Sequence, residues 1–366
     1  MEFNIIQSLL KSSSGKIILI VMDGLGGTPM EPGGPTELEA ADTPNMDRLA
    51  AEGICGLHQP IGSGITPGSG PAHLALFGYD PLKFQVGRGV LSALGVGFDL
   101  QPDDVAARGN FCTIDSGGKV TDRRAGRIPT EKNEELLAVM RDKIKLKESG
   151  VEFFIQPVKE YRFLLVLRGE GLIGNLRDTD PQETGKAPLE PRATVEGGGK
   201  TVEVVRDFIA QAKEALKDQH PANMALLRGF SKKPDWPLFP EVFGVKAAAI
   251  AGYPMYRGVT RLIGMDVLQT GDKPEEELEV LKANWDNYDY FYFHIKKTDS
   301  AGEDGDFDRK KSIIEDADKI IPRIMELNPA VVVITGDHSA PAAMKYHSWH
   351  PVPALLWSRH NSRPDN

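Results

Sequence analysis

The chain has 366 residues, about twice the length of a typical single domain, so two domains or one domain with a large insertion are expected. Its 40% hydrophobic and 26% charged residues exclude a disordered chain, and its 38 glycines and 26 prolines without a Gly-X-Y period exclude a collagen. The net charge of −9 argues against a nucleic-acid scaffold, although it leaves room for a locally basic pocket.

The cysteine count and the N-terminal residues indicate the compartment. Two cysteines, Cys55 and Cys112, are too few for a disulfide framework, so a reduced cytoplasm is expected. Residues 2–11 lack the basic region and the long apolar run of a signal peptide. No apolar run approaches the roughly 18 residues that a membrane span needs. We therefore expect a cytoplasmic protein without a membrane partner.

Apolar runs alternate with amphipathic segments along the whole chain. Residues 16–23 form a continuous apolar run that ends in an acid, which is typical of a buried parallel strand. The expected strands are residues 16–23, 108–114, 151–156, 161–167, 246–251, 288–295, 330–335 and 353–357. The expected helices are residues 44–52, 130–145, 201–216, 275–285 and 316–327, with another beginning at residue 72 and loops at 59–71 and 174–200. This alternation predicts an α/β fold with a mostly parallel sheet.

Acidic residues and histidines follow several of the expected strands. Asp23, Asp299 and the pair Asp337–His338 stand at or just after strand ends, where open parallel sheets place their sites. Three of the eight histidines fall close together, at positions 338, 347 and 350. Carboxylates and imidazoles without thiolates suit Mn²⁺, Zn²⁺ or Mg²⁺ bound in pairs. Asp337 and His338 could instead be ordinary turn residues, but the coincidence of several strand ends favours a metal site.

Ser69 is the candidate nucleophile. It lies between two glycines just before a helix, where backbone N–H groups and the helix dipole favour an anion. The alternative is a simple helix cap. Apart from His73, one turn further on, no histidine that could act as its base is near in sequence, so a metal would have to lower the pKa of the hydroxyl instead.

Arginines are concentrated in one short segment. Residues 122–127 (DRRAGR) contain Asp122, Arg123, Arg124 and Arg127. Arginine side chains match the geometry of phosphate and carboxylate groups, although a solvated surface run is the alternative. Further candidates beside glycines or apolar segments are Arg228, Arg257 and Arg261.

Seven segments together resemble one known family. They are MDGLGG (22–27), ADTPNMDRLAAEG (41–53), TPGSGPAHLALFGYDP (66–81), DRRAGRI (122–128), KKTDSAGEDGD (296–306), TGDHSAPAA (335–343) and HSWHPVPALL (347–356). In this order they are similar to the archaeal-type cofactor-independent phosphoglycerate mutases of the alkaline phosphatase superfamily, a group of two-metal phosphoryl-transfer enzymes. The resemblance runs from about residue 16 to about residue 357 and so covers nearly the whole chain.

The resemblance implies a discontinuous architecture and an activity. A three-layer, alkaline-phosphatase-like metal domain would comprise residues 1–95 and 265–366, and a smaller α/β substrate domain would be inserted at residues 96–264. The implied reaction interconverts 3-phosphoglycerate and 2-phosphoglycerate through a phosphoserine, on two divalent metal ions and without 2,3-bisphosphoglycerate. The implied partner is a small-molecule substrate, with no nucleic acid, and the sequence indicates no oligomeric state.

The resemblance also implies roles for individual residues. One metal would be held by Asp23, Ser69, Asp337 and His338, and the other by Asp299, Glu303 and His347 rather than His350. Ser69 would be the nucleophile and Asp122 a general acid or base. Substrate contacts would come from Arg123, Arg124, Arg127, Arg228 and Arg257.

Two features depart from the family pattern. The family motif usually has histidine where this chain has Glu303, and an additional oxygen ligand favours Mn²⁺ or Mg²⁺ over Zn²⁺. The sequence stops soon after Trp357, where family members usually continue with a further helical segment, so the end is expected to be trimmed.

Two other functions fit the sequence less well. One is a phosphatase or phosphotransferase of the same superfamily that acts on another small phosphorylated metabolite, an option that Glu303 keeps open. The other is a non-catalytic binding protein, which the complete set of candidate ligands makes the poorer interpretation.

Overall fold

The computed structural model describes residues 3–11, 14–271 and 273–360, and the chain divides into two compact units. Unit 1 joins Met1–Gln85 to Trp236–Asn366, and unit 2 is the intervening segment Val86–Asp235. Unit 1 is therefore formed by two separate segments of the sequence, and unit 2 is inserted between them.

These boundaries differ from the expected insertion at residues 96–264. The helix α5 (Arg88–Val96) packs against β3 (Val105–Ile114) and therefore belongs to unit 2. The strand β8 (Ala247–Ile250) pairs in parallel with β10 (Tyr290–Ile295) and therefore belongs to the sheet of unit 1. Sheet pairing and helix packing, which the motifs do not report, decide both boundaries.

Unit 1 is built on a seven-stranded sheet in the order β2-β12-β11-β1-β10-β8-β9. Its further strands are β1 (Ile17–Met22), β2 (Ile54–His58), β9 (Asp266–Leu268), β11 (Val331–Thr335) and β12 (Val352–Ser358). Five neighbouring strands, β11 to β9 in this order, run parallel, and β12 and β2 form an antiparallel edge. The predicted α/β fold with a mostly parallel sheet is confirmed.

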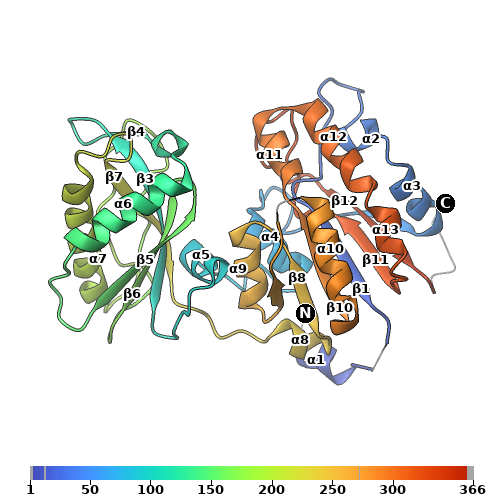
Figure 1. Ribbon diagram of the computed structural model, residues 1–366, viewed down its shortest axis with the longest axis horizontal. Helices are drawn as coiled ribbons and strands as arrows, with labels where there is room; N and C mark the ends of the chain where they lie inside the picture. Colours follow the sequence, from blue (N-terminus) through green and yellow to red (C-terminus); the bar gives the residue numbers. More distant parts are fainter. Residues whose placement is uncertain (1–2, 12–13, 272, 361–366) are drawn as a thin grey trace. The chain divides into compact units, whose positions relative to one another are not determined.

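Helices cover both faces of this sheet. They are α1 (Phe3–Ser8), α2 (Glu37–Ala40), α3 (Pro44–Glu52), α4 (Ser69–Leu76), α8 (Phe239–Phe243), α9 (Pro254–Leu262), α10 (Pro274–Asn284), α11 (Lys297–Asp304), α12 (Phe307–Asp318) and α13 (Ile321–Met325). Figure 1 shows α10, α12 and α13 along the sheet, where their apolar side chains pack on Ile18, Ile20 and Phe293. On the other face the ring of Phe77 lies 5.1 Å from that of Tyr292. Alternate side chains of each strand thus serve two separate cores.

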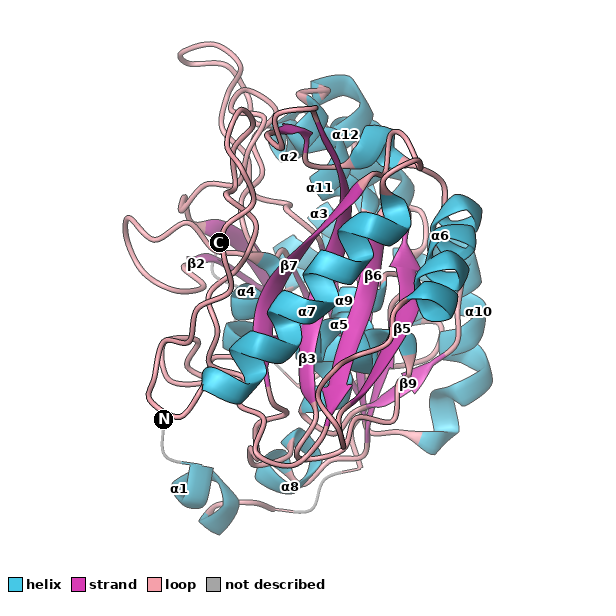
Figure 2. Cartoon of the chain, turned by 90° about the vertical axis from the view of Figure 1, so that its left-hand side faces the viewer, coloured by secondary structure: helices cyan, strands magenta, loops and turns pink. Residues whose placement is uncertain are grey.

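Unit 2 has its own antiparallel sheet and core. Beside α5 and β3 it contains β4 (Val120–Asp122), α6 (Thr130–Lys143), β5 (Glu152–Lys159), β6 (Arg162–Arg168), α7 (Gly199–Leu216) and β7 (Met224–Ser231). The central strand β3 pairs antiparallel with both β6 and β7. Figure 2 shows α6 and α7 in front of this sheet, and their apolar faces share one buried cluster with it.

One expected helix is wrong in its extent. Residues 316–327 were expected to form a single helix, but α12 ends at Asp318 and α13 begins at Ile321. Pro322 lies in the first turn of α13, where a missing N–H is tolerated, so it begins a new helix. Within the described ranges, no helix is both long and apolar enough to cross a membrane.

Truncation of Phe208 tests how much the core of unit 2 contributes to stability. This side chain of α7 is fully buried, so we expect Phe208→Ala to lower the free energy of unfolding by about 3–5 kcal/mol. The exposed neighbour Lys213 on the same helix is the control, and Lys213→Ala should change it by less than about 0.5 kcal/mol. Urea unfolding followed by circular dichroism measures both. Equal losses in the two variants would contradict this packing.

Candidate metal centre and arginine cluster

Three loops of unit 1 meet at the carboxyl ends of neighbouring parallel strands. The central strand β1 pairs on one side with β10, Met22 opposite Ile295, and on the other with β11, Val21 opposite Thr335. The loops that follow these strands therefore emerge side by side. The first carries Asp23, the second leads to Asp299 in the first turn of α11, and the third carries Asp337 and His338.

Glycines allow these loops to approach closely. Gly24 has φ +65°, and a Cβ there would lie 2.8 Å from the Cβ of Ala340 and 3.1 Å from that of Asp299. A Cβ on Gly26 would lie 1.9 Å from the Ser339 hydroxyl. Side chains at these positions would force the loops apart. The two glycines are thus a condition for bringing the acidic residues together.

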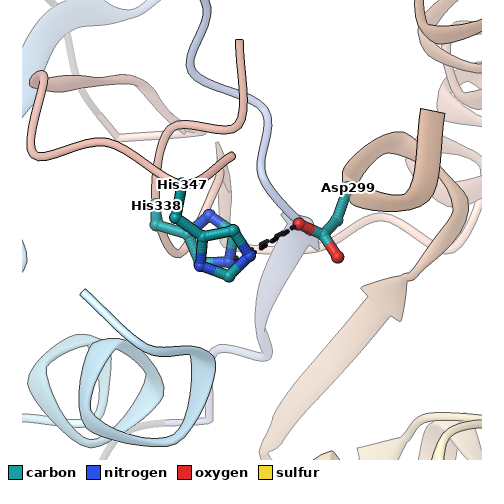
Figure 3. Close-up of side chains that lie close together, drawn as sticks. All are labelled: Asp299, His338 and His347. Atoms are coloured by element: carbon teal, nitrogen blue, oxygen red, sulfur yellow. Dashed lines mark ion pairs between the residues drawn. The ribbon is translucent and has the colours of Figure 1, made fainter. Parts of the chain in front are cut away.

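The loops form two groups of candidate metal ligands that share His338. Ligand atoms of Asp23, Asp337 and His338 lie within 4.8 Å of one another, and so do those of Asp299, His338 and His347. His338 Nε2 lies 3.3 Å from Asp23 Oδ1 and 3.4 Å from Asp337 Oδ2. Figure 3 shows the second group, in which His347 Nε2 lies 3.1 Å from Asp299 Oδ1.

The donor atoms of these groups suit a cation. Within the described part of the chain, Asp23 Oδ1, Asp299 Oδ1, Asp337 Oδ2 and His338 Nδ1 are buried and make no hydrogen bond. A buried carboxylate is costly unless positive charge compensates it. Oxygen donors with imidazoles are ligands for divalent cations such as Mn²⁺, Mg²⁺ and Zn²⁺. The residues present therefore fit divalent metal ions.

The carboxylates control the protonation of His338. Burial alone would lower its pKa, but Asp337, Asp23 and Asp299 raise it to about 9. Burial would likewise raise the pKa of Asp23, but Lys296 and two histidine rings hold it well below its ordinary value. Without a cation, a protonated imidazole therefore compensates part of the negative charge.

Lys296 is a functional candidate that the sequence analysis did not single out. Its Nζ lies 2.9 Å from Asp23 Oδ2 and also contacts Asp299. Burial would lower its pKa, but these two carboxylates raise it above its ordinary value. Lys296 and Lys297 are adjacent in sequence, so the sequence does not show which of them reaches the carboxylates. The structure places Lys296 between the end of β10 at Ile295 and the start of α11 at Lys297.

Ser69 lies at the start of α4, next to the shared histidine. It is the first residue of the helix, after Gly68 in an extended conformation, and its Oγ lies 3.5 Å from His338 Nε2. The first N–H groups of a helix are unpaired and favour an anion. The hydroxyl, the helix terminus and the candidate ligands are therefore next to one another.

The second group contains His347 but not Glu303 or His350. Glu303 is half-exposed, its Oε1 lies 3.6 Å from His347 Nε2, and it joins neither group among the described residues. His350 bonds instead to the hydroxyl of Ser348 at 2.9 Å. Asp306, close to Glu303 in sequence, caps α12, and its Oδ1 accepts from the Arg309 N–H at 3.0 Å.

Buried aromatic and histidine side chains contact the residues of the first group. The hydroxyl of Tyr256 donates to Asp23 Oδ2, and His294 Nε2 lies 3.5 Å from the same oxygen. His73 Nδ1 contacts the Ser69 carbonyl at 2.7 Å and Asp337 Oδ2 at 3.3 Å. Sequence reasoning weighed His73 only as a base and passed over the other two, although alternation along β10 places His294 on the face opposite Phe293.

In unit 2, two of the predicted substrate arginines share one buried acid. Arg123 makes two hydrogen bonds to Asp180, of 3.0 and 2.7 Å, and Arg228 Nη1 lies 3.5 Å from Asp180 Oδ2. Arg228 also pairs with Asp178 at 3.2 Å. Burial alone would raise the pKa of Asp180, but the hydrogen bonds and charges of the arginines keep it below its ordinary value. The sequence analysis missed both acids because residues 174–200 lack a regular pattern.

Asp122 holds the loop that carries the other two arginines. Its Oδ1 accepts from the Arg124 N–H at 2.8 Å and its Oδ2 from the Gly126 N–H at 2.6 Å. Ala125 and Arg127 have positive φ values of 45° and 53°, which strain residues with a side chain. The loop exposes Arg124 and Arg127, so the alternative of a solvated surface run applies only to these two arginines.

Arg257 lies apart from the arginines of unit 2, on α9 of unit 1. Its Nη2 donates to Gln269 Oε1 at 3.3 Å, and burial together with the nearby Arg261 lowers its pKa. It follows Tyr256, which contacts Asp23. The structure thus brings together Asp23, Ser69, Asp299, Asp337, His338 and His347 in unit 1, and Arg123 with Arg228 in unit 2.

A mostly parallel sheet with candidate metal ligands at its carboxyl edge places this chain among the α/β proteins whose sites lie at the ends of parallel strands. A sequence model of the family described as 2,3-bisphosphoglycerate-independent phosphoglycerate mutase matches residues 50–223. A relative from Thermus thermophilus with the name probable 2,3-bisphosphoglycerate-independent phosphoglycerate mutase is 53% identical over 97% of this chain and 88% of its own. One from Aquifex aeolicus with the same name is 51% identical over 97% and 89%.

Solved structures agree with these relatives. A protein from Pyrococcus horikoshii has a TM-score of 0.79 at 30% identity, over 96% of this chain and 89% of its own. The cofactor-independent phosphoglycerate mutase from Thermoplasma acidophilum has a TM-score of 0.68 at 32% identity, over 96% and 92%. The chain belongs to the family of 2,3-bisphosphoglycerate-independent phosphoglycerate mutases, a family of enzymes.

Cation binding should release the proton of His338. The pKa of about 9 means that the ring is protonated at pH 7.5, and a cation binds only the neutral ring. We expect Mn²⁺ binding at pH 7.5 to release about one proton, measured by calorimetry in buffers of different ionisation enthalpy. His350→Gln, outside both groups, should release the same number, and heats that do not depend on the buffer would contradict this coupling.

The same shift predicts the stability of the metal-free protein. A folded-state pKa of about 9, above the ordinary 6.5, contributes stability that is fully present below pH 6.5 and is lost as pH rises through about 9. In the presence of a chelator, the urea midpoint of the unaltered chain should therefore fall as the pH rises from 6.5 to about 9. The His338→Gln variant should not show this fall. An unchanged decline would assign it to another group.

Asp180 should matter more for stability than Asp178. Asp180→Asn removes the buried acid that Arg123 and Arg228 share, so we expect a loss of about 3 kcal/mol in the free energy of unfolding. The side chain of Asp178 is 31% exposed, and Asp178→Asn should cost about 1 kcal/mol. Urea unfolding measures both, and the reverse order would contradict this arrangement.

Proposed function

We propose that this chain interconverts 3-phosphoglycerate and 2-phosphoglycerate through a phosphorylated Ser69, without 2,3-bisphosphoglycerate. One observation carries the proposal: Ser69 Oγ lies 3.5 Å from His338, the residue shared by both ligand groups, at the N-terminus of α4. Family membership and the names of the relatives support it. The expected compartment is the cytoplasm, and the partner is the small-molecule substrate.

We assign two divalent ions to unit 1. One would be held by Asp23, Ser69, Asp337 and His338, and the other by Asp299, Glu303 and His347. When bound, such ions supply positive charge for a phosphoryl group in transfer and lower the pKa of a nearby hydroxyl. The oxygen-rich ligand sets favour Mn²⁺ first, then Mg²⁺, over Zn²⁺.

In the first half-reaction Ser69 is the nucleophile. Its hydroxyl loses its proton to solvent, and its Oγ attacks the phosphorus of 3-phosphoglycerate in line, while the bond from phosphorus to the C3 oxygen breaks. The C3 oxygen takes up a proton, for which Asp122 is the proposed donor. The products are phosphoserine and glycerate. The ammonium of Lys296 and the N-terminus of α4 stabilise the negative charge at the serine.

In the second half-reaction the phosphoryl group moves to the other hydroxyl. The C2 hydroxyl gives its proton to Asp122, and its oxygen attacks the phosphorus of the phosphoserine, while the bond from phosphorus to Ser69 Oγ breaks. Ser69 Oγ then takes up a proton from solvent. No atom is gained or lost over the cycle. We assign the glycerate carboxylate to the arginines Arg123, Arg124, Arg127 and Arg228, with Arg257 as a further contact. Water must be kept away from the phosphoserine, because its attack would release phosphate.

Replacement of Ser69 tests the proposal. In an enolase-coupled assay without 2,3-bisphosphoglycerate and with Mn²⁺, we expect Ser69→Ala to lower kcat by roughly 10⁴-fold or more, because the nucleophile is lost. A chelator should abolish the activity of the unaltered chain, and Mn²⁺ should restore it. Ser63, exposed in the preceding loop, is the matched control, and Ser63→Ala should keep full activity.

Two outcomes would contradict the proposal. Turnover by Ser69→Ala close to that of the unaltered chain would remove the phosphoserine step. Release of inorganic phosphate from 3-phosphoglycerate without any 2-phosphoglycerate would instead assign the chain to the phosphatases of the same superfamily.

A further inference from the structure

The fully buried lysine of α12 has no place in the reaction just described. The Nζ of Lys310 donates to the carbonyl oxygens of Gly26 and Ala340, each at 3.0 Å, and lies 3.7 Å from Glu37 Oε1. Both Lys310 and Glu37 have no exposed side-chain surface. Burial of an ammonium costs free energy, and a hydrophobic side chain could fill the same position. The presence of a lysine here therefore needs a physical reason.

The two carbonyls belong to the two loops that carry the first ligand group. Gly26 follows Asp23 by three residues, and Ala340 follows His338 by two. The loops are already joined by the Ala340 N–H, which donates to the Gly26 carbonyl at 3.0 Å. Lys310 adds a charged donor to this junction and connects both loops to α12. Hydrogen bonds from charged donors are stronger than neutral ones.

Glu37 completes the junction from the side of α2. Its Oε1 accepts from the Ala342 N–H at 2.7 Å. Its Oε2 lies so close to Gly27 that a Cβ on that residue would be only 1.9 Å from the oxygen. Glu37 therefore contacts the same two loops as Lys310, one residue or two further along. The charges of Lys310 and Glu37 compensate each other, while Lys310 Nζ and Glu37 Oε1 make hydrogen bonds to the backbone of the two loops.

The ammonium is charged at neutral pH. Burial lowers the pKa of Lys310 to about 8, against the opposing charges of Glu37 and Asp299. Among the described residues, these two carboxylates are the charges that raise the pKa of the lysine, and Glu37 forms an ion pair with it.

We propose that Lys310, together with Glu37, is a positioning residue that sets the spacing between Asp23 and the pair Asp337–His338 for a divalent cation. The inference rests on the metal centre of the proposed function. It assigns no chemistry to the lysine, which acts through the backbone of the two loops. Residues that orient metal ligands in this way typically change metal affinity by 10- to 100-fold when they are replaced.

The experiment must separate positioning from a contribution to folding. Lys310→Met alone leaves Glu37 as an unpaired buried charge and should lower both stability and metal affinity. In the double variant Lys310→Met with Glu37→Gln, that charge is gone and the amide oxygen still accepts from Ala342. We therefore expect the double variant to recover most of the lost stability in the presence of a chelator.

Metal affinity gives the deciding result. Titration of Mn²⁺ into the full chain, followed by the electron paramagnetic resonance of free Mn²⁺, should show binding at least about 10-fold weaker in the double variant than in the unaltered chain. The matched control is Lys311→Met, since Lys311 is partly exposed and pairs only with Glu315 at 3.6 Å among the ion pairs described. This control should bind Mn²⁺ like the unaltered chain.

The outcomes distinguish this inference from the proposed function. Recovery of Mn²⁺ affinity together with stability in the double variant would make Lys310 a folding residue only and overturn the inference alone. Absence of Mn²⁺ binding by the unaltered chain would overturn both the metal centre and the inference. If Lys310→Met does not fold, the double variant still carries the comparison.

Discussion

Three buried carboxylates meet around the ring of His338, and their mutual repulsion is the constraint that organises unit 1. Asp23, Asp299 and Asp337 come from three parallel strands, and without compensation their charges would separate the loops. The raised pKa of His338 and the ammonium of Lys296 supply part of the positive charge. The proposed divalent ions supply the rest. The repulsion among the carboxylates thus lowers the stability of the metal-free fold and at the same time favours the binding of metal.

Unit 2 contains the opposite arrangement. There the acid Asp180 is buried, and the groups that pair with it are arginines. The acid pairs with Arg123 and Arg228 and thereby fixes the positions of both guanidinium groups. Asp122 does the same for the backbone of the loop that exposes Arg124 and Arg127. Under the proposed function, the candidate metal centre would bind the phosphoryl group and the arginines would bind the carboxylate of the substrate.

Much of this could be predicted from the sequence, because a few strong patterns carry it. The apolar runs of β1 and β11 predict buried parallel strands, and the rule that sites lie at carboxyl ends predicts that Asp23, Asp299 and Asp337 come together. The rest depends on contacts between distant segments. Lys310 lies in an amphipathic helix where a lysine is normally exposed, and Asp180 lies in a segment without periodicity, so neither position indicates burial. The break between α12 and α13 follows from Pro322, a local signal that the longer apolar pattern concealed.

The central claim is that this edge of the sheet holds two divalent cations. Anomalous diffraction at the manganese absorption edge, from crystals of the full chain grown with Mn²⁺, tests it most directly. The proposed centre predicts two peaks, one in contact with Asp23, Asp337 and His338 and the other with Asp299 and His347. A map without a peak at the carboxyl ends of β1, β10 and β11, or with manganese only elsewhere, would contradict it.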